Sequence, residues 1–132
     1  MTNDEIRIKI AKLCGYNWYE INKEATLCNV SYAGILPKGR EVVDHPSEGS
    51  KLYFICPNWP ESIADAWELV EEMRANHFSI KLMAWDHTDK WVVIMHHRQG
   101  HDEKIPDDEI ESDTAPLAIC LAYIAWKEAT ND

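Results

Sequence analysis

Histidines and aspartates around one predicted hairpin are the residues whose types could bind a metal: His87, His96, His97, His101, Asp86, Asp89 and Asp102. A transition metal needs three or four such ligands converging on one point. His96 and His97 are adjacent, so in a strand they point to opposite faces and at most one joins a shared site. No recognised ligand spacing is present. We therefore expect no metal site, and a metal-assisted hydrolase is the weakest of three functional hypotheses.

Nucleophilic side chains give little support for catalysis. No serine lies in a Gly-x-Ser-x-Gly elbow, and Ser62 is better explained as a helix cap. The cysteines, which are Cys14, Cys28, Cys56 and Cys120, include no Cys-x-x-Cys pair, so we expect reduced thiols without a disulfide. A Cys–His pair assembled in space stays open. Neither a dinucleotide-binding glycine motif nor a P-loop is present, so we expect no cofactor and favour a binding protein over an enzyme.

Aromatic and basic side chains point instead to ligand binding. Six tryptophans in 132 residues, with Tyr19, Tyr32 and Tyr53, exceed what one small core needs. Aromatic rings stack on nucleobases, and the free N–H groups at a helix start bind phosphate. Trp59 lies in a proline-flanked segment just before the predicted helix start at Ser62, which brings a ring and backbone donors together. The predicted ligand-binding residues are Trp59, Ser62, Lys38, Arg40 and Trp18, with the turn at 37–40 closing the site.

The charge limits the partners that the chain can have. It carries 23 acidic and 13 basic residues, a net charge of −10. Such a chain repels duplex nucleic acid and anionic membranes. The acidic stretch 102–111 is short and interrupted, so we interpret it as a solvated loop rather than a mimic of nucleic acid. Residues 1–10 lack the apolar core of a signal peptide, and no apolar run reaches membrane-spanning length, so we expect a cytoplasmic location.

Three helices are expected to position these residues. The first spans 2–13, with a capping box from Thr2 to Glu5 and Gly15 as its stop. The second spans 62–76 and starts at Ser62. The third spans 114–128, capped by Asp113 or Thr114.

A hairpin over 78–97 forms the centre of the predicted sheet. Apolar runs at 78–85 and 91–97 flank a five-residue loop. The run WVVIM at 91–95 is apolar throughout, which is typical of a central strand covered on both faces. Residues 16–50 look irregular, with short strands possible within 26–36 and a β-type run at 51–56. The polar stretch 99–112 is predicted to be a mobile loop.

The core is expected where two helical stripes meet this hairpin. The second helix carries apolar residues at 63, 66, 67, 70 and 73, and the third at 117, 120, 121 and 124. The side chains predicted to be buried together are Trp67, Val70, Leu117, Cys120 and Ile124. The length suits a single domain over 1–132, which needs no disulfide or metal to fold.

Three segments resemble the phage ABA sandwich domain. They are WPESIADAWELVEEM at 59–73, the hairpin ending in Trp91-Val92-Val93, and TAPLAICLA at 114–122; the early helix ending near Gly15 also fits. The resemblance implies a phage origin and layers of helix, sheet and helix, and it brings no catalytic motif. We therefore expect an α+β protein, an α/β/α-type sandwich whose antiparallel sheet carries the central hairpin 78–97 and is covered by the three helices.

The favoured hypothesis is a phage-encoded, non-enzymatic binding protein. One concrete form is a counter-defence protein that sequesters a host nucleotide immune signal in the cytoplasm of the infected bacterium. The alternative is an inhibitor that binds a host protein through a surface patch. Surplus tryptophan and tyrosine also favour a homo-oligomer, with a dimer expected, although the acidic charge opposes association.

Overall fold

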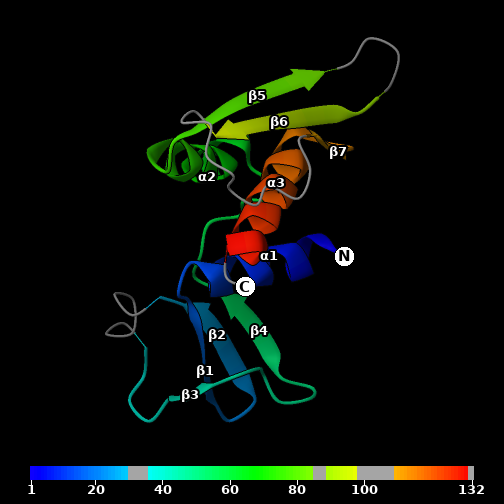
Figure 1. Cartoon of the computed structure of the whole chain (residues 1–132). Helices are drawn as coiled ribbons and strands as arrows, with labels where there is room; N and C mark the ends of the chain where they lie inside the picture. The colour runs from blue at the N-terminus through cyan, green and yellow to red at the C-terminus, as the bar shows by residue number, and fades with distance from the viewer. Residues whose placement is uncertain (30–35, 85–88, 98–108, 131–132) are drawn as a thin grey trace. The chain divides into compact units, whose positions relative to one another are not determined.

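The structure, a computed structural model, describes residues 1–29, 36–84, 89–97 and 109–130. The chain forms two compact units. The hairpin unit comprises residues 1–7 and 58–132, and the four-stranded unit comprises residues 8–57 (Figure 1). Helix α1 (Asn3–Leu13) begins in the former and ends in the latter. The single domain expected over 1–132 stays a prediction.

Both ends of α1 follow from the sequence signals. The Thr2 hydroxyl accepts a hydrogen bond from the Glu5 backbone N–H at 3.1 Å, as a capping box requires. Beyond the last turn, Gly15 has a φ of +90°. The N–H of Tyr16 donates to the Ala11 carbonyl at 2.8 Å, and the N–H of Gly15 donates to the Lys12 carbonyl at 3.1 Å. These two bonds form a Schellman motif, which satisfies carbonyls that the helix end leaves free.

The hairpin unit contains the predicted hairpin. Strands β5 (Phe78–Ala84) and β6 (Trp91–His97) pair in antiparallel fashion, and β7 (Glu109–Ser112) pairs with the other side of β6. The order β5-β6-β7 makes β6 the central strand, as predicted. Neighbours Val92 and Val93 point to opposite faces and are 1% and 0% exposed, so both faces of β6 are covered.

Strand β7 corrects part of the loop predicted over 99–112. Residues 109–112 alternate between exposed and half-buried side chains, so Ile110 and Ser112 can face inward while the two glutamates stay in water. Because the segment is rich in acidic residues, its composition predicted a solvated loop rather than a strand. The remainder of that prediction, 99–108, lies outside the described residues.

Helices α2 (Ile63–Ala75) and α3 (Ala115–Thr130) pack on this sheet (Figure 1). The rings of Phe78 and Trp126 meet edge to face, with centroids 5.5 Å apart. Ser62 caps α2 by accepting from the Asp65 N–H at 3.2 Å, as predicted. The Asp65 carboxylate accepts from the Asn58 N–H at 2.8 Å, which ties the preceding segment to the helix start. The expected α+β sandwich class is confirmed.

The predicted core needs one clear correction. Val70, Cys120 and Ile124 are buried and Leu117 is half-buried, but Trp67 is 46% exposed, so its placement in the core was wrong. Helix α2 turns a different set of side chains inward: Ala66, Leu69, Val70 and Met73. Their i, i+3, i+4, i+7 spacing makes a complete stripe. Ile63 and Trp67 are left exposed one turn apart.

The four-stranded unit corrects the irregular structure predicted for residues 16–50. Its sheet has the order β3-β1-β2-β4, formed by β1 (Asn17–Ile21), β2 (Glu24–Cys28), β3 (Glu41–Val43) and β4 (Lys51–Phe54). Strands β1 and β2 form a hairpin, whereas β2 and β4 are parallel. The hairpin turn uses Asn22 and Lys23, with φ of 47° and 64°. No glycine marks this turn, which is why the sequence did not reveal it.

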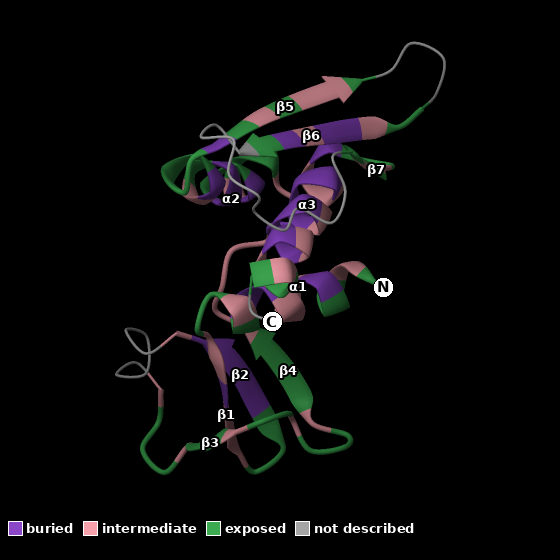
Figure 2. Ribbon diagram, viewed as in Figure 1, coloured by how far each residue is buried: buried purple, intermediate pink, exposed green. Residues whose placement is uncertain are grey.

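The two faces of this sheet differ in burial. One face carries Trp18, Leu27 and Phe54, which are in register across three strands; the Trp18 and Phe54 rings have centroids 6.0 Å apart. Trp18 and Leu27 are 1% and 0% exposed, and Figure 2 shows β2 as largely buried. The opposite face carries a cross-strand row that we call the tyrosine face, made of Val42, Tyr19, Thr26 and Tyr53.

Two tryptophans of the hairpin unit should respond very differently to truncation. Trp59 is 3% exposed, so Trp59→Ala should lower the free energy of unfolding by about 3–5 kcal/mol. Trp67→Ala removes a half-exposed ring and should cost less than about 1.5 kcal/mol. Urea unfolding of both variants measures the difference. Equal losses of unfolding free energy in the two variants would contradict the burial of Trp59 and the exposure of Trp67.

Substitutions at Gly15 test the Schellman motif that ends α1. A Cβ at this position would meet nothing within 4 Å, so Gly15→Ala creates no clash. The positive φ alone should then lower the free energy of unfolding by about 1–2 kcal/mol. Gly15→Asn should cost less, because asparagine tolerates this conformation. If alanine were as stable as glycine in the same urea titration, the Schellman ending would be refuted.

Candidate functional site

The residues predicted to bind a ligand are divided between the two units. Trp59 and Ser62 belong to the hairpin unit, whereas Trp18, Lys38 and Arg40 belong to the four-stranded unit. Trp59 and Trp18 are 3% and 1% exposed. Neither indole offers a free face, so a base could stack on them only if the rings became exposed. Their contact with a ligand, and that of Ser62, stay predictions.

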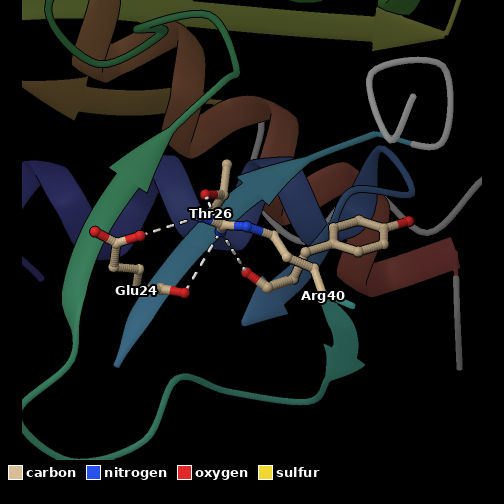
Figure 3. A network of polar contacts seen from close by, with 4 residues as sticks. Glu24, Thr26 and Arg40 are labelled. Carbon is tan, nitrogen blue, oxygen red and sulfur yellow. Dashed lines mark hydrogen bonds and ion pairs between the residues drawn. The ribbon is translucent and has the colours of Figure 1, made fainter. Parts of the chain in front are cut away.

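Arg40 lies at the centre of a polar network on the tyrosine face (Figure 3). Its side chain is only 8% exposed. The Nη1 group donates to the Thr26 hydroxyl at 2.6 Å, to the Tyr19 carbonyl at 3.3 Å and to the Glu24 carbonyl at 3.4 Å. Thr26, the buried polar residue of β2, is thereby paired. One nitrogen of the guanidinium therefore bridges β1 and β2.

The other edge of the guanidinium makes only weak contacts with the described residues. Nη2 meets the Glu24 carboxylate at 3.5 Å, and that carboxylate is itself 52% exposed. The Nε atom is buried and has no hydrogen-bond partner among the described residues. Nε and Nη2 share the edge with which arginine takes both oxygens of a carboxylate or phosphate. A buried cation with an unmet donor is costly, and an oxyanion is the group that would satisfy it.

Aromatic rings and a second cation accompany Arg40. Tyr19 and Tyr53 lie on either side of Thr26, about 10 Å apart, because two strand spacings separate them. Tyr53 is 38% exposed, and the Lys51 ammonium lies 5.4 Å from its ring centroid. The exposed Lys38 is two residues from Arg40 in the chain. The sequence showed these tyrosines only as part of an aromatic surplus; the strand register brings them to one face.

A second feature is a hollow in the hairpin unit, between α2 and β5. Its volume is about 360 Å³, within the range of small ligand sites. The lining residues are Trp67, Val70, Arg74, Phe78, Ser79, Ile80, Leu82 and Ile119. Among the described residues, the lining includes no carboxylate, imidazole or thiol that could act as a general base. Arg74 is exposed and pairs with Glu71 at 3.0 Å.

The two units differ sharply in charge. The hairpin unit has 7 basic and 18 acidic residues, a net charge of −11, and the four-stranded unit has 6 basic and 5 acidic residues, a net charge of +1. An anionic ligand is therefore favoured on the four-stranded unit and opposed on the hairpin unit.

The cysteines form no disulfide, and the two buried ones, Cys28 and Cys120, have little nucleophilic character. Burial raises the pKa of Cys120 to about 12. Burial also raises the pKa of Cys28, although the positive charge of Arg40 acts in the opposite direction. Both thiols therefore stay protonated near neutral pH, and the thiolate is the reactive form. Of the predicted histidine group, only the exposed side chain of His96 falls among the described residues.

The described residues also contain no helix long and apolar enough to cross a membrane.

The helices and sheets of the two units define an α+β protein of the layered, sandwich class. The model of the phage ABA sandwich domain matches residues 34–124. The chain belongs to this family, as its helix and hairpin segments suggested. No curated protein and no solved structure matches the chain significantly.

Thiol accessibility gives a direct test of the burial around these sites. In the native protein, Cys14 should react at once with a thiol reagent because it is exposed, and Cys56 more slowly. Cys28 and Cys120 should react only on unfolding, because both are buried and protonated. A Cys14→Ser variant should lose the fast phase alone. Fewer than four thiols in fresh, denatured protein would contradict the free cysteines.

Proposed function

We propose that this phage-family protein is a non-enzymatic binding protein that holds a nucleotide-type small molecule on the tyrosine face of its four-stranded unit. In an infected bacterium, such a protein would serve counter-defence by sequestering a nucleotide immune signal. The observation that carries the proposal is the buried Arg40, whose Nε has no hydrogen-bond partner in the part of the chain that the structure describes.

The phosphate contact follows from the geometry of the guanidinium. A phosphate approaching the edge formed by Nε and Nη2 would satisfy the free donor and displace the long contact to Glu24. Glu24 is half exposed, so water can solvate it once it is released. Lys51, and Lys38 if its turn closes over the face, would add charge.

The base would stack on a tyrosine. Tyr53 is the better candidate because more than a third of its surface is free and Lys51 lies over its ring. Aromatic side chains on neighbouring strands hold bases in this way in several single-strand-binding sheets. In this proposal the tyrosines take the stacking role that the sequence suggested for Trp59 and Trp18.

Binding without turnover is favoured by the chemistry around Arg40. The buried side chains there are the Thr26 hydroxyl and the Cys28 thiol, whose raised pKa keeps it protonated. The nearby carboxylate of Glu24 lies 3.5 Å from Nη2 of Arg40. Arrangements of this kind hold an anion in place and provide no activated nucleophile.

Calorimetry with mono-, cyclic and ADP-ribose-type nucleotides tests the proposal. We expect at least one to bind, with affinity falling as salt rises. Arg40→Lys keeps the charge and removes the two-donor edge, so it should weaken binding about 10-fold or more. Tyr53→Ala should weaken binding about 5-fold to 100-fold through lost stacking.

Leu52→Ala is the matched control, because Leu52 is 42% exposed and points to the other face of the same strand. It should bind like the wild type, and a cooperative thermal transition in each variant should show that the variant is folded. Ligand recovered intact after denaturation would support sequestration. No heat with any nucleotide would refute the proposal, and chemically altered ligand would indicate an enzyme.

A further inference from the structure

Two tyrosines flank the position of Arg40 on the tyrosine face. In the cross-strand row, Thr26 of β2 lies between Tyr19 of β1 and Tyr53 of β4, one strand spacing from each. Side chains in strands stand roughly perpendicular to the sheet, so the two tyrosines rise from it about 10 Å apart. The guanidinium of Arg40 donates to the hydroxyl of Thr26 at 2.6 Å, which places it between the two tyrosine strands.

The spacing of the two tyrosines suits two bases better than one. Successive bases in a strand stack about 3.4 Å apart. At that spacing, one base between two rings needs the rings about 7 Å apart, whereas two stacked bases need about 10 Å. Hydrogen bonds between neighbouring strands hold β1, β2 and β4 at fixed spacing, so the backbone positions of Tyr19 and Tyr53 match the longer distance.

The positive charge lies where the linkage of such a ligand would be. The Nε atom of Arg40 is buried and has no hydrogen-bond partner among the described residues, and it shares its edge with Nη2. The Lys51 ammonium, 5.4 Å from the Tyr53 ring centroid, adds a second cation. A molecule in which a phosphate joins two nucleosides carries its negative charge between its two bases, just as Arg40 lies between the two tyrosines.

We propose that the ligand of the tyrosine face is a dinucleotide, in which a phosphodiester links two nucleosides. One base stacks on Tyr19, the other stacks on Tyr53, and the phosphate oxygens accept from Nε and Nη2 of Arg40. Tyr19 is half-buried and Tyr53 is 38% exposed, so both residues keep accessible surface. This inference rests on the proposed function and narrows its ligand to the class with two bases.

Calorimetry with the full chain tests it with three probes that share one base: adenosine monophosphate, the linear dinucleotide of two adenosines, and cyclic di-adenosine monophosphate. A guanosine set repeats the comparison. We expect the linear or the cyclic form to bind one per chain, about 5-fold to 100-fold more tightly than the mononucleotide, because a second base is stacked. The linear form carries less negative charge than the mononucleotide, so tighter binding by it cannot come from charge.

A variant of Tyr19 separates the two bases. Tyr19→Leu should weaken binding of the two-base probe about 5-fold to 100-fold and leave the mononucleotide, which needs only Tyr53, unchanged. Tyr19→Phe keeps the ring and should bind both probes like the wild type. Leu52→Ala, on the other face of β4, is again the control. The comparison of probes on the wild-type chain needs no variant, so it decides the matter even if Tyr19→Leu fails to fold.

Three results would overturn this inference and leave the proposed function intact. They are equal affinity for the mononucleotide and the two-base probes, an equal loss of both in Tyr19→Leu, and one dinucleotide bound by two chains, because its bases would then lie on separate copies. Absence of binding by every probe would instead refute the proposed function, and this inference with it.

Discussion

The organisation of the four-stranded unit depends on how a buried guanidinium is compensated. Arg40 precedes a three-residue strand and extends over two others, where one nitrogen serves a hydroxyl and two carbonyls. Removing a cation from water is costly, and these hydrogen bonds recover only part of that cost. Part of the desolvation cost remains because Nε has no hydrogen-bond partner among the described residues. The guanidinium lies on the face that carries Tyr19 and Tyr53. The same guanidinium therefore bridges the short strands and carries the donor on which the proposed anion contact depends.

The two units differ in net charge. Nearly all of the excess acid of the chain lies in residues 1–7 and 58–132, while residues 8–57 are close to neutral. A net charge of −10, taken over the whole chain, argues against any anionic ligand. Taken unit by unit, the charge does not oppose an anion on the four-stranded unit, whose net charge is +1. Among the described residues, the exposed Trp67 lies in the acidic unit.

The sequence predicted the helices, the hairpin and their caps because each has a strong local signal. Thr2, Ser62 and Gly15 act within one turn of the chain, and β6 is apolar at consecutive positions. Trp67 was misplaced because two overlapping apolar stripes run along α2 and share Ala66, Val70 and Met73. The packed helix buries Leu69 with these three residues and leaves Trp67 exposed. Arg40 was predicted to be a ligand residue from its turn, and its contact with a ligand stays a prediction. Its tyrosine neighbours depend on strand register, which local patterns do not contain.

The parallel pairing of β2 with β4 has a consequence for how the chain folds. Residues 24–28 must meet residues 51–54 across a connection that itself contributes β3 to the far side of the sheet. The loop that closes is several times longer than the one joining β5 to β6, and closing it costs more chain entropy before any contact is gained. We expect the hairpin of residues 78–97 to form faster than this parallel pairing once both are free to fold. During synthesis, residues 24–54 leave the ribosome before residues 78–97, so the slower pairing also has the earlier start.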